Sequence, residues 1–497
     1  MAMAAIVAGI MFAPMQPAAG QDGGSFTPGK WGIGDPYYPL MGNGGYDARH
    51  YGLQVRYNPA NNRLRGRARI RAVARQNLSR FNLDLVGLSV ESIDVDGAAA
   101  TWRRPTTREL VITPDQGIEE GDVFVVVVDY AGVPRQCVLR RLGTCGALHT
   151  DDGLLIIGQP ESASSWFPVN DHPLDKATYT ISLEVPAGVE AISNGALRNR
   201  ATSGGWTTWT WGDAGPTASY LTIVALGQFG IRRRQAPGGI PLLDAVDPDL
   251  GRRIDRSLHK QGRILRFLTR RFGPYPFDHV GAIVDDREVG YALETQTRPF
   301  YDYRTLTDRR GGEFFIVHEL AHQWFGDSVS IKRWKNIWLN EGFATYAEWL
   351  WSKSLGGGWL SPKQIYRNFC RSSRRQLGLP KNFWKVRPAA PGPNRIFHPA
   401  VYERGGLTLQ ALRRRVGARD FFTTVRSWLN ERRNGHANTR DFIAHAERVS
   451  GENLDRLFRR WLFTAHKPKP CRKLATGRSS DAAVRPLEHY SRTFVHR

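Results

Sequence analysis

The chain has 497 residues, too long for one ordinary hydrophobic core, and 41% of them are hydrophobic, so we expect a globular protein of two or three domains. Its formal net charge is +23, from 69 Lys and Arg against 46 Asp and Glu, with the excess spread over many segments. Because no nucleic-acid-binding motif accompanies this charge, we expect a solvated basic surface and no specific nucleic acid partner.

The N-terminus resembles a signal peptide, which we assign to residues 1–20. Ala4 to Ala13 form an apolar run of suitable length, and small residues follow at positions 18–20. No later stretch has the length and apolarity of a transmembrane helix. We therefore expect a secreted or cell-envelope protein. Since no Lys or Arg precedes the run, a cytoplasmic protein with a non-functional apolar tail is the alternative.

An all-β domain is expected over residues 48–235, after an extended Gly-, Pro- and Tyr-rich arm at 21–47. Short alternating or β-branched runs recur through this region, as strands of a saddle or sandwich-like domain would. The runs are Tyr51–Tyr57, Arg67–Ala74, Val90–Val95, Val123–Tyr130, Tyr179–Val185 and Tyr220–Val224.

Helical periodicity begins in the following region, so the chain as a whole is expected to be a multidomain α+β protein. Apolar residues in Leu250–Phe272 recur at helical spacing, and the Gly and Pro residues after Phe272 end the pattern. We assign residues 236–400 to an α/β domain, 401–470 to its helical C-terminal part and 471–497 to a disordered basic tail. Further helices are expected from Glu341 to Leu350 and at 406–416, 418–432 and 439–449.

Four cysteines allow three disulfide pairings. Cys137 and Cys145 form the simplest closed loop. The alternative is four unpaired thiols, including Cys370 and Cys471.

A metal-binding motif lies at His318-Glu319-Leu320-Ala321-His322. Residues four apart share one helix face, so both histidines can bind one ion while Glu319 lies beside it. Glu341, 19 residues beyond His322, is the expected third ligand, on a second helix with Asn340 as a candidate cap. Two histidines and one carboxylate leave a zinc ion an open position for water, so we expect one Zn²⁺. The alternative is a chance motif with satisfied core histidines.

With HELAHQWFGD at 318–327 and NEGFATYAEW at 340–349, the chain resembles the aminopeptidase N family of zinc metallopeptidases. These are gluzincins, and the resemblance implies a thermolysin-like catalytic domain. GYALETQ at 290–296 is similar to the family's Gly-x-Met-Glu-Asn motif, with Leu293 in place of Met and Thr295 in place of Asn. The match covers Tyr51 to Phe463. It lacks the extensive C-terminal helical domain of long members, as in compact secreted bacterial forms.

The resemblance implies a role for several side chains. Glu319 would be the general base, and Tyr402, in the similar segment VYERGG at 401–406, would stabilise the oxyanion. Glu294 and Glu161 would bind the substrate's α-amino group. Apart from the resemblance, carboxylates commonly orient zinc-bound histidines, so Glu348 and Asp327 are expected either to do so or to be solvent-exposed acids beside the helices. Residues expected to line the substrate site are Gln159, Gly290, Tyr291, Ala292 and Leu293.

These features predict a zinc-dependent aminopeptidase that acts on peptides with a free N-terminus. A zincin endopeptidase would use the same metal centre without an amine anchor, and a catalytically silent peptide-binding protein would keep only the fold. An epoxide hydrolase side activity, known in one branch of the family, stays open. The preferred N-terminal residue and the oligomeric state also stay open.

Overall fold

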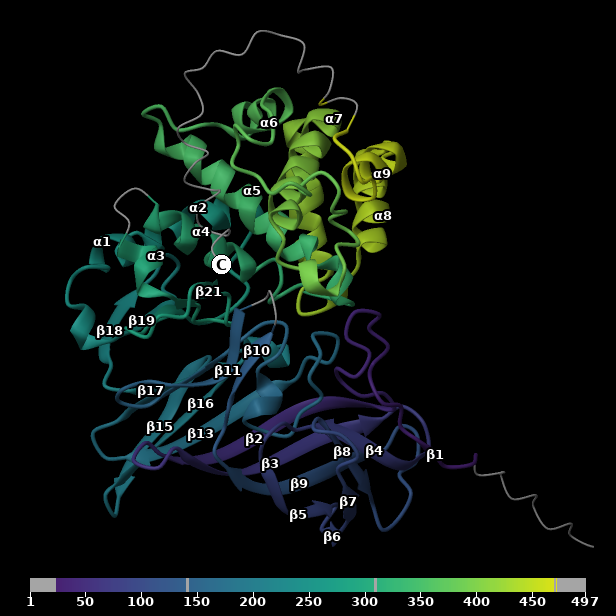
Figure 1. Ribbon diagram of the computed structural model, residues 1–497, viewed down its shortest axis with the longest axis vertical. Helices are drawn as coiled ribbons and strands as arrows, with labels where there is room; N and C mark the ends of the chain where they lie inside the picture. The colour runs from purple at the N-terminus through teal and green to yellow at the C-terminus, as the bar shows by residue number, and fades with distance from the viewer. Residues whose placement is uncertain (1–23, 140–142, 308–310, 469–470, 472–497) are drawn as a thin grey trace, which may run out of the picture.

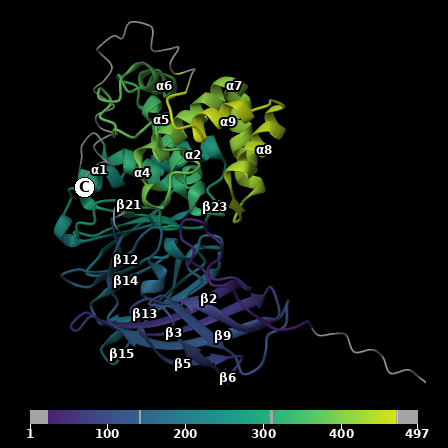
Figure 2. The same ribbon diagram turned by 45° about the vertical axis from the view of Figure 1, so that its right-hand side comes forward.

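The computed structural model describes residues 24–139, 143–307, 311–468 and 471. A β-rich part formed by the first half of the chain lies against a mainly helical part formed by the second half (Figures 1 and 2). The expected signal peptide and residues 472–497 lie outside the described residues. Among the described helices, none combines the length and the apolarity needed to cross a bilayer.

An eight-stranded sheet is the largest element of the β-rich part. Its central strands alternate between inward apolar and outward polar side chains, and in β3 the outward residues are mainly arginines. This period of two is what a sheet with one solvated face requires. In spatial order the strands are β15 (Ala196–Ser203), β16 (Trp206–Gly212), β13 (Thr178–Pro186), β2 (Tyr46–Asn58), β3 (Arg63–Ala74), β9 (Val123–Gly132), β5 (Ser89–Val95) and β6 (Ala98–Ala99).

Two smaller sheets complete this part, and its side chains share one hydrophobic core. The expectation of a β-rich N-terminal domain is therefore confirmed. One sheet has the order β1 (Thr27–Pro28), β4 (Leu78–Asp84), β8 (Glu109–Thr113) and β7 (Thr101–Arg103). The other has the order β10 (Gln136–Leu139), β11 (Gly143–His149), β12 (Leu154–Ile157), β17 (Val224–Gly227) and β14 (Glu190–Ile192), and a 3-10 turn, η1 (Ala163–Ser165), follows β12.

One strand expectation was wrong. Tyr220 lies in a 3-10 turn, η2 (Ser219–Leu221), and β17 begins only at Val224. The turn is fixed by polar side chains, because Ser219 Oγ donates to Asp171 Oδ1 at 2.8 Å and Thr222 Oγ1 donates to the Ser219 carbonyl at 2.7 Å. These contacts outweigh the local preference for an extended chain.

A five-stranded sheet begins the second part. Its order is β18 (Gly230–Gln235), β19 (Pro241–Val246), β20 (Val280–Val284), β22 (Phe300–Tyr301) and β21 (Ala292–Leu293). The helical periodicity of Leu250–Phe272 corresponds to η3 (Pro248–Leu250), α1 (Asp255–Leu258) and α2 (Gln261–Phe272), and α2 ends at Gly273, whose φ is 105°. Helices α3 (Tyr303–Thr307) and α4 (Gly312–His322) follow.

The remaining helices share the hydrophobic core of α4, with α5 packed against α4 and α7 packed against α5, α8 and α9. The two helices expected at 406–416 and 418–432 are the halves of α7, separated at Gly417, whose φ is 86°. The short helices α6 and α9 were not expected. Asn340 is not a cap, because α5 begins at Trp338 and buries Asn340 in its first turn. The elements are β23 (Ser330–Ile331), η4 (Trp334–Asn336), α5 (Trp338–Leu355), α6 (Pro362–Arg371), η5 (Pro393–Arg395), α7 (Pro399–Glu431), β24 (His436–Ala437), α8 (Thr439–Ser450) and α9 (Asp455–Leu462).

Helices α5 and α7 are in backbone contact at two glycines. A Cβ added to Gly342 would lie 2.8 Å from the Cα of Gly405, and one added to Gly405 would lie 2.7 Å from the Cα of Gly342. Since real Cβ atoms do not come so close to a backbone, both positions require glycine. The contact brings Glu341 and Tyr402, near the starts of these helices, to one end of the helix pair.

Both disulfides of the chain are formed. Cys137 bonds Cys145 across strands β10 and β11, as expected for the simplest loop. Cys370, in α6, bonds Cys471 over a separation of 101 residues. The inclusion of Cys471 in a disordered tail was therefore wrong, because this residue is fully buried and covalently fixed to the helical part.

Candidate metal centre

Two histidines of α4 and one glutamate of α5 come together where the two helices pack. His318 Nε2 lies 3.2 Å from Glu341 Oε2, and His322 Nε2 lies 3.4 Å from the same oxygen. All three residues are at most 3% exposed. The four-residue spacing places both rings on one helix face, and the packing of α5 against α4 brings Glu341 over them, as the sequence predicted.

The Nδ1 nitrogens of both histidines are hydrogen-bonded, which fixes the direction of each ring. His318 Nδ1 lies 2.6 Å from Glu348 Oε1, and His322 Nδ1 lies 3.0 Å from the Phe325 carbonyl. Because both partners are acceptors, each Nδ1 carries the proton and each Nε2 presents its lone pair.

This donor set fits zinc. Ligand atoms that each lie about 2.1 Å from a tetrahedral zinc ion are roughly 3.4 Å apart, close to both separations in the structure. Burial raises the pKa of the Glu341 carboxyl, but the two histidines more than offset this effect and hold the pKa below its ordinary value. Glu341 is therefore an anion at neutral pH, as a metal ligand must be.

Glu348 contacts the ring of His318, as expected, whereas Asp327 contacts His322 only through its backbone N–H, which donates to the His322 carbonyl at 3.1 Å. The carboxylate oxygens of Asp327 are buried and form no hydrogen bond within the described part of the chain. Its backbone carbonyl accepts a hydrogen bond from Lys176 Nζ at 2.6 Å. The turn after α4 therefore places Asp327 beside Lys176, and its carboxylate accepts no hydrogen bond from either histidine ring.

Glu319 lies beside the three-residue set. One of its carboxylate oxygens is within 4.8 Å of donor atoms of His322 and Glu294. Burial raises the pKa of the Glu319 carboxyl to about 8, although the two histidines lower it. A divalent cation bound nearby would lower the pKa further, because it favours the ionised form.

Glu294 follows β21 and is held by two residues of the β-rich part. Its Oε1 accepts hydrogen bonds from Gln159 Nε2 at 2.9 Å and from the Tyr220 hydroxyl at 3.2 Å. Tyr220 was not singled out from the sequence, because nothing local distinguishes this tyrosine from a strand residue. Glu161, by contrast, forms an ion pair with Arg108, and its side chain is 20% exposed.

The segment before Glu294 is anchored at several points. The Gly290 N–H donates to Asp302 Oδ2 at 2.7 Å, and the Tyr291 hydroxyl donates to the Thr144 carbonyl at 2.7 Å. Ala292 is half-buried, whereas Leu293 is 2% exposed and packs in the core of the β-rich part. The segment thus runs along the boundary between the two parts.

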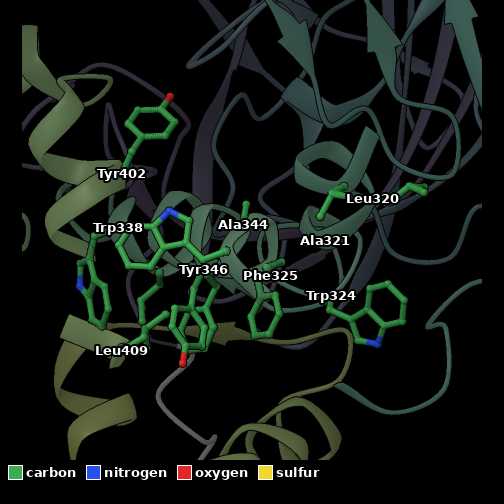
Figure 3. Close-up of a cluster of buried hydrophobic side chains, with 14 of the residues drawn as sticks. Leu320, Ala321, Trp324, Phe325, Trp338, Ala344, Tyr346, Tyr402 and Leu409 are labelled. Carbon is green, nitrogen blue, oxygen red and sulfur yellow. The ribbon is translucent and has the colours of Figure 1, made fainter. Parts of the chain in front are cut away.

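Tyr402 extends from the first turn of α7 toward the metal centre. Its ring centroid lies 6.0 Å from that of His318. In Figure 3 its hydroxyl is directed away from the packed cluster that contains Trp338 and Leu409. Burial, together with nearby carboxylates, raises the pKa of Tyr402 well above its ordinary value. The phenol is therefore a protonated hydrogen-bond donor at neutral pH.

We expect Glu348→Ala to lower zinc affinity by about 10- to 100-fold, because the His318 ring loses the acceptor that fixes its tautomer and direction. Competition with a chromophoric chelator measures the affinity. Glu348→Gln retains an acceptor at this position and should lose less. Wild-type affinity in Glu348→Ala would contradict the orienting role.

Two family profiles match the chain. The profile of the Peptidase M1 N-terminal domain matches residues 47–221, and that of the Peptidase family M1 domain matches residues 257–461. "Aminopeptidase M1" of Arabidopsis thaliana is 25% identical over 80% of this chain and 49% of its own length. "Thyrotropin-releasing hormone-degrading ectoenzyme" of Homo sapiens is 24% identical over 87% of this chain and 44% of its own length. The chain spans about half the length of these curated relatives.

Similar solved structures have nearly the same extent as this chain. An M1 zinc metallopeptidase from Deinococcus radiodurans is 28% identical, with a TM-score of 0.78 over 88% of this chain and 98% of its own. A two-domain M1 zinc metallopeptidase bound to L-tryptophan is also 28% identical, with a TM-score of 0.79 over 88% of this chain and 99% of its own. With the metal-ligand set in place and both domains matched, the chain belongs to the M1 family of peptidases, in its two-domain form.

Proposed function

We propose that this protein is a zinc-dependent aminopeptidase that removes the N-terminal residue from peptides. The observation that carries the proposal is the position of Glu294. This carboxylate is buried, and one of its oxygens lies within 4.8 Å of a ring nitrogen of His322 and of a carboxylate oxygen of Glu319. A carboxylate there can pair with a free α-ammonium group next to the scissile bond. This restricts cleavage to the first residue of a peptide.

His318, His322 and Glu341 would hold the ion. Bound zinc supplies Lewis-acid polarisation of the scissile carbonyl and lowers the pKa of water at the open position. Glu319, beside the ligands, takes the proton from the attacking water and delivers it to the leaving amine. The protonated Tyr402 hydroxyl donates to the oxyanion that develops on the carbonyl oxygen.

Glu294 fixes the substrate's ammonium, and the residues before it form one side of the site. Gln159 supports Glu294 by its hydrogen bond. Glu161 is proposed as a second amine anchor, which would require it to release Arg108. Gly290, Tyr291, Ala292 and Leu293 are proposed to flank the first residue of the substrate.

Hydrolysis of paired anilides tests the proposal. We expect cleavage of free-amine amino-acid anilides, loss of that activity with a chelator and recovery on addition of zinc. The N-acetylated anilides should not react, because they present no ammonium to Glu294. Cleavage of internally positioned bonds in blocked peptides would instead indicate an endopeptidase, and no cleavage of either series would indicate a binding protein.

Export of the protein is also proposed. Two disulfides favour an oxidising compartment, in agreement with the signal-like N-terminus. Fractionation of the native host should recover the protein outside the cytoplasm, and a purely cytoplasmic distribution would contradict export.

A further inference from the structure

The Glu294 carboxylate is held asymmetrically. The two hydrogen bonds that it accepts from other side chains, from Gln159 Nε2 at 2.9 Å and from the Tyr220 hydroxyl at 3.2 Å, both end on Oε1. The Glu294 N–H also donates to its own carboxylate, and no other described side chain donates to Oε2. Oε2 is therefore the oxygen that neither neighbouring side chain occupies, and it can accept from a ligand.

Tyr220 itself is firmly placed in the boundary between the two parts. It is 1% exposed, and its ring packs edge-on against Trp334 with centroids 5.3 Å apart. The carbonyl of the next residue, Leu221, accepts hydrogen bonds from Gln296 N at 3.2 Å and from Asn194 Nδ2 at 2.9 Å. The Tyr220 hydroxyl therefore has little freedom to leave Glu294.

The segment that carries Glu294 is also tied to the helix that bears the histidines. Gln323, the residue after His322, donates from Nε2 to the Glu294 carbonyl at 3.4 Å. Its Oε1 accepts from the Thr297 N–H at 2.8 Å. The backbone of Glu294 is thus positioned by α4, and its side chain is positioned by Tyr220 and Gln159.

We propose that Tyr220 is a positioning residue that acts through Glu294. Its hydroxyl occupies Oε1 and so leaves Oε2 to accept from the primary ammonium group of the substrate. A donor on Oε1 also stabilises the ionised carboxylate, which is the form that pairs with a cation. This inference rests on the proposed function, since it assigns a partner to the amine anchor.

The expected consequence is a selective loss of ammonium recognition in Tyr220→Phe. The substitution keeps the ring against Trp334 and removes only the hydroxyl. We expect inhibition by an amino-acid amide to weaken on the order of 10-fold, because a hydrogen bond to a charged group is lost. The KM for a free-amine anilide should rise by a similar factor, with kcat changing much less.

Inhibition constants of the zinc-loaded enzyme provide the test. Each variant is measured with leucinamide and with 4-methylpentanamide, which has the same carbon chain but no amine. Inhibition by the des-amino amide should change by no more than about 2-fold, because it makes no contact with Glu294. Equal weakening of both amides would overturn the proposal, since a purely structural role for Tyr220 would not distinguish them.

Two further variants serve as a control and as a test of coupling between Tyr220 and Glu294. Tyr46→Phe removes another buried hydroxyl, which donates to the Asn82 carbonyl at 2.7 Å within the β-rich part, and should leave both amides unaffected. Tyr220→Phe should add no further loss in a Glu294→Gln background if Tyr220 acts through Glu294. An independent, additive loss would overturn the proposal.

The same data separate this inference from the proposed function. If the wild-type enzyme binds both amides equally and Glu294→Gln changes neither constant, the amine anchor itself is wrong. A different result would show that only the role of Tyr220 is wrong. In that case the wild type binds leucinamide more tightly than 4-methylpentanamide, Glu294→Gln abolishes this preference, and Tyr220→Phe preserves it.

Discussion

Glu319→Gln should retain zinc and lose nearly all turnover. The glutamine has almost the same shape but cannot accept the proton of the attacking water or deliver it to the leaving amine. Since a positioned general base typically contributes about 10²- to 10⁴-fold, we expect kcat to fall within or beyond this range. The measurement pairs steady-state hydrolysis of a free-amine anilide with the zinc content of the purified variant.

Glu313→Gln is the matched control, because Glu313 lies on the same helix and forms an ion pair with Lys260 at 3.1 Å. It should keep zinc and most of the turnover. Substantial hydrolysis by Glu319→Gln would show that another group is the base. Loss of zinc from Glu319→Gln would show that this residue supports the metal centre instead.

Tyr402→Phe should reduce kcat by about 10²- to 10³-fold with a modest change in KM. The Phe ring fills the same space, so zinc binding should be preserved, while the donor to the developing oxyanion is lost. Since an oxyanion forms only along the reaction path, the loss belongs to the transition state more than to substrate binding. Steady-state kinetics and metal analysis of the variant measure both effects.

Tyr346→Phe provides the control for this substitution. Tyr346 is a buried tyrosine of α5 whose hydroxyl donates to Gln410 Oε1 at 3.0 Å. We expect it to lose some stability and retain turnover. A wild-type kcat in Tyr402→Phe would remove Tyr402 from the reaction, and depletion of zinc would indicate a structural role.

Local periodicity correctly predicted the regular strands and helices. The outward arginines of β3 alternate with buried apolar residues, and this alternation identified the strand. The apolar pattern of α2 likewise identified a helix, and its end at Gly273 followed from the glycine there. The same reasoning wrongly placed Tyr220 in a strand, because the long-range contact between Ser219 and Asp171 fixes a turn there.

The ligand set could also be predicted, because two of its members are linked by the pitch of one helix. The spacing of His318 and His322 determines that their rings share a face, whatever the rest of the chain does. To predict Glu341 as the third ligand, it was enough to expect that a second helix returns antiparallel to the first. Asp327 was wrongly expected to orient a histidine ring, because its carboxylate forms no hydrogen bond in the described part of the chain and the direction of a turn does not follow from spacing.

The sequence by itself determined the long strands and helices, the metal ligands and the family resemblance, since these depend on short-range spacing. Only the tertiary structure decided how Glu294 is held. Its partners Gln159 and Tyr220 lie 135 and 74 residues away in the sequence and meet it where the two parts pack together. The same holds for the bond between Cys370 and Cys471. Contacts of this kind arise from the burial of whole surfaces, which no local pattern records.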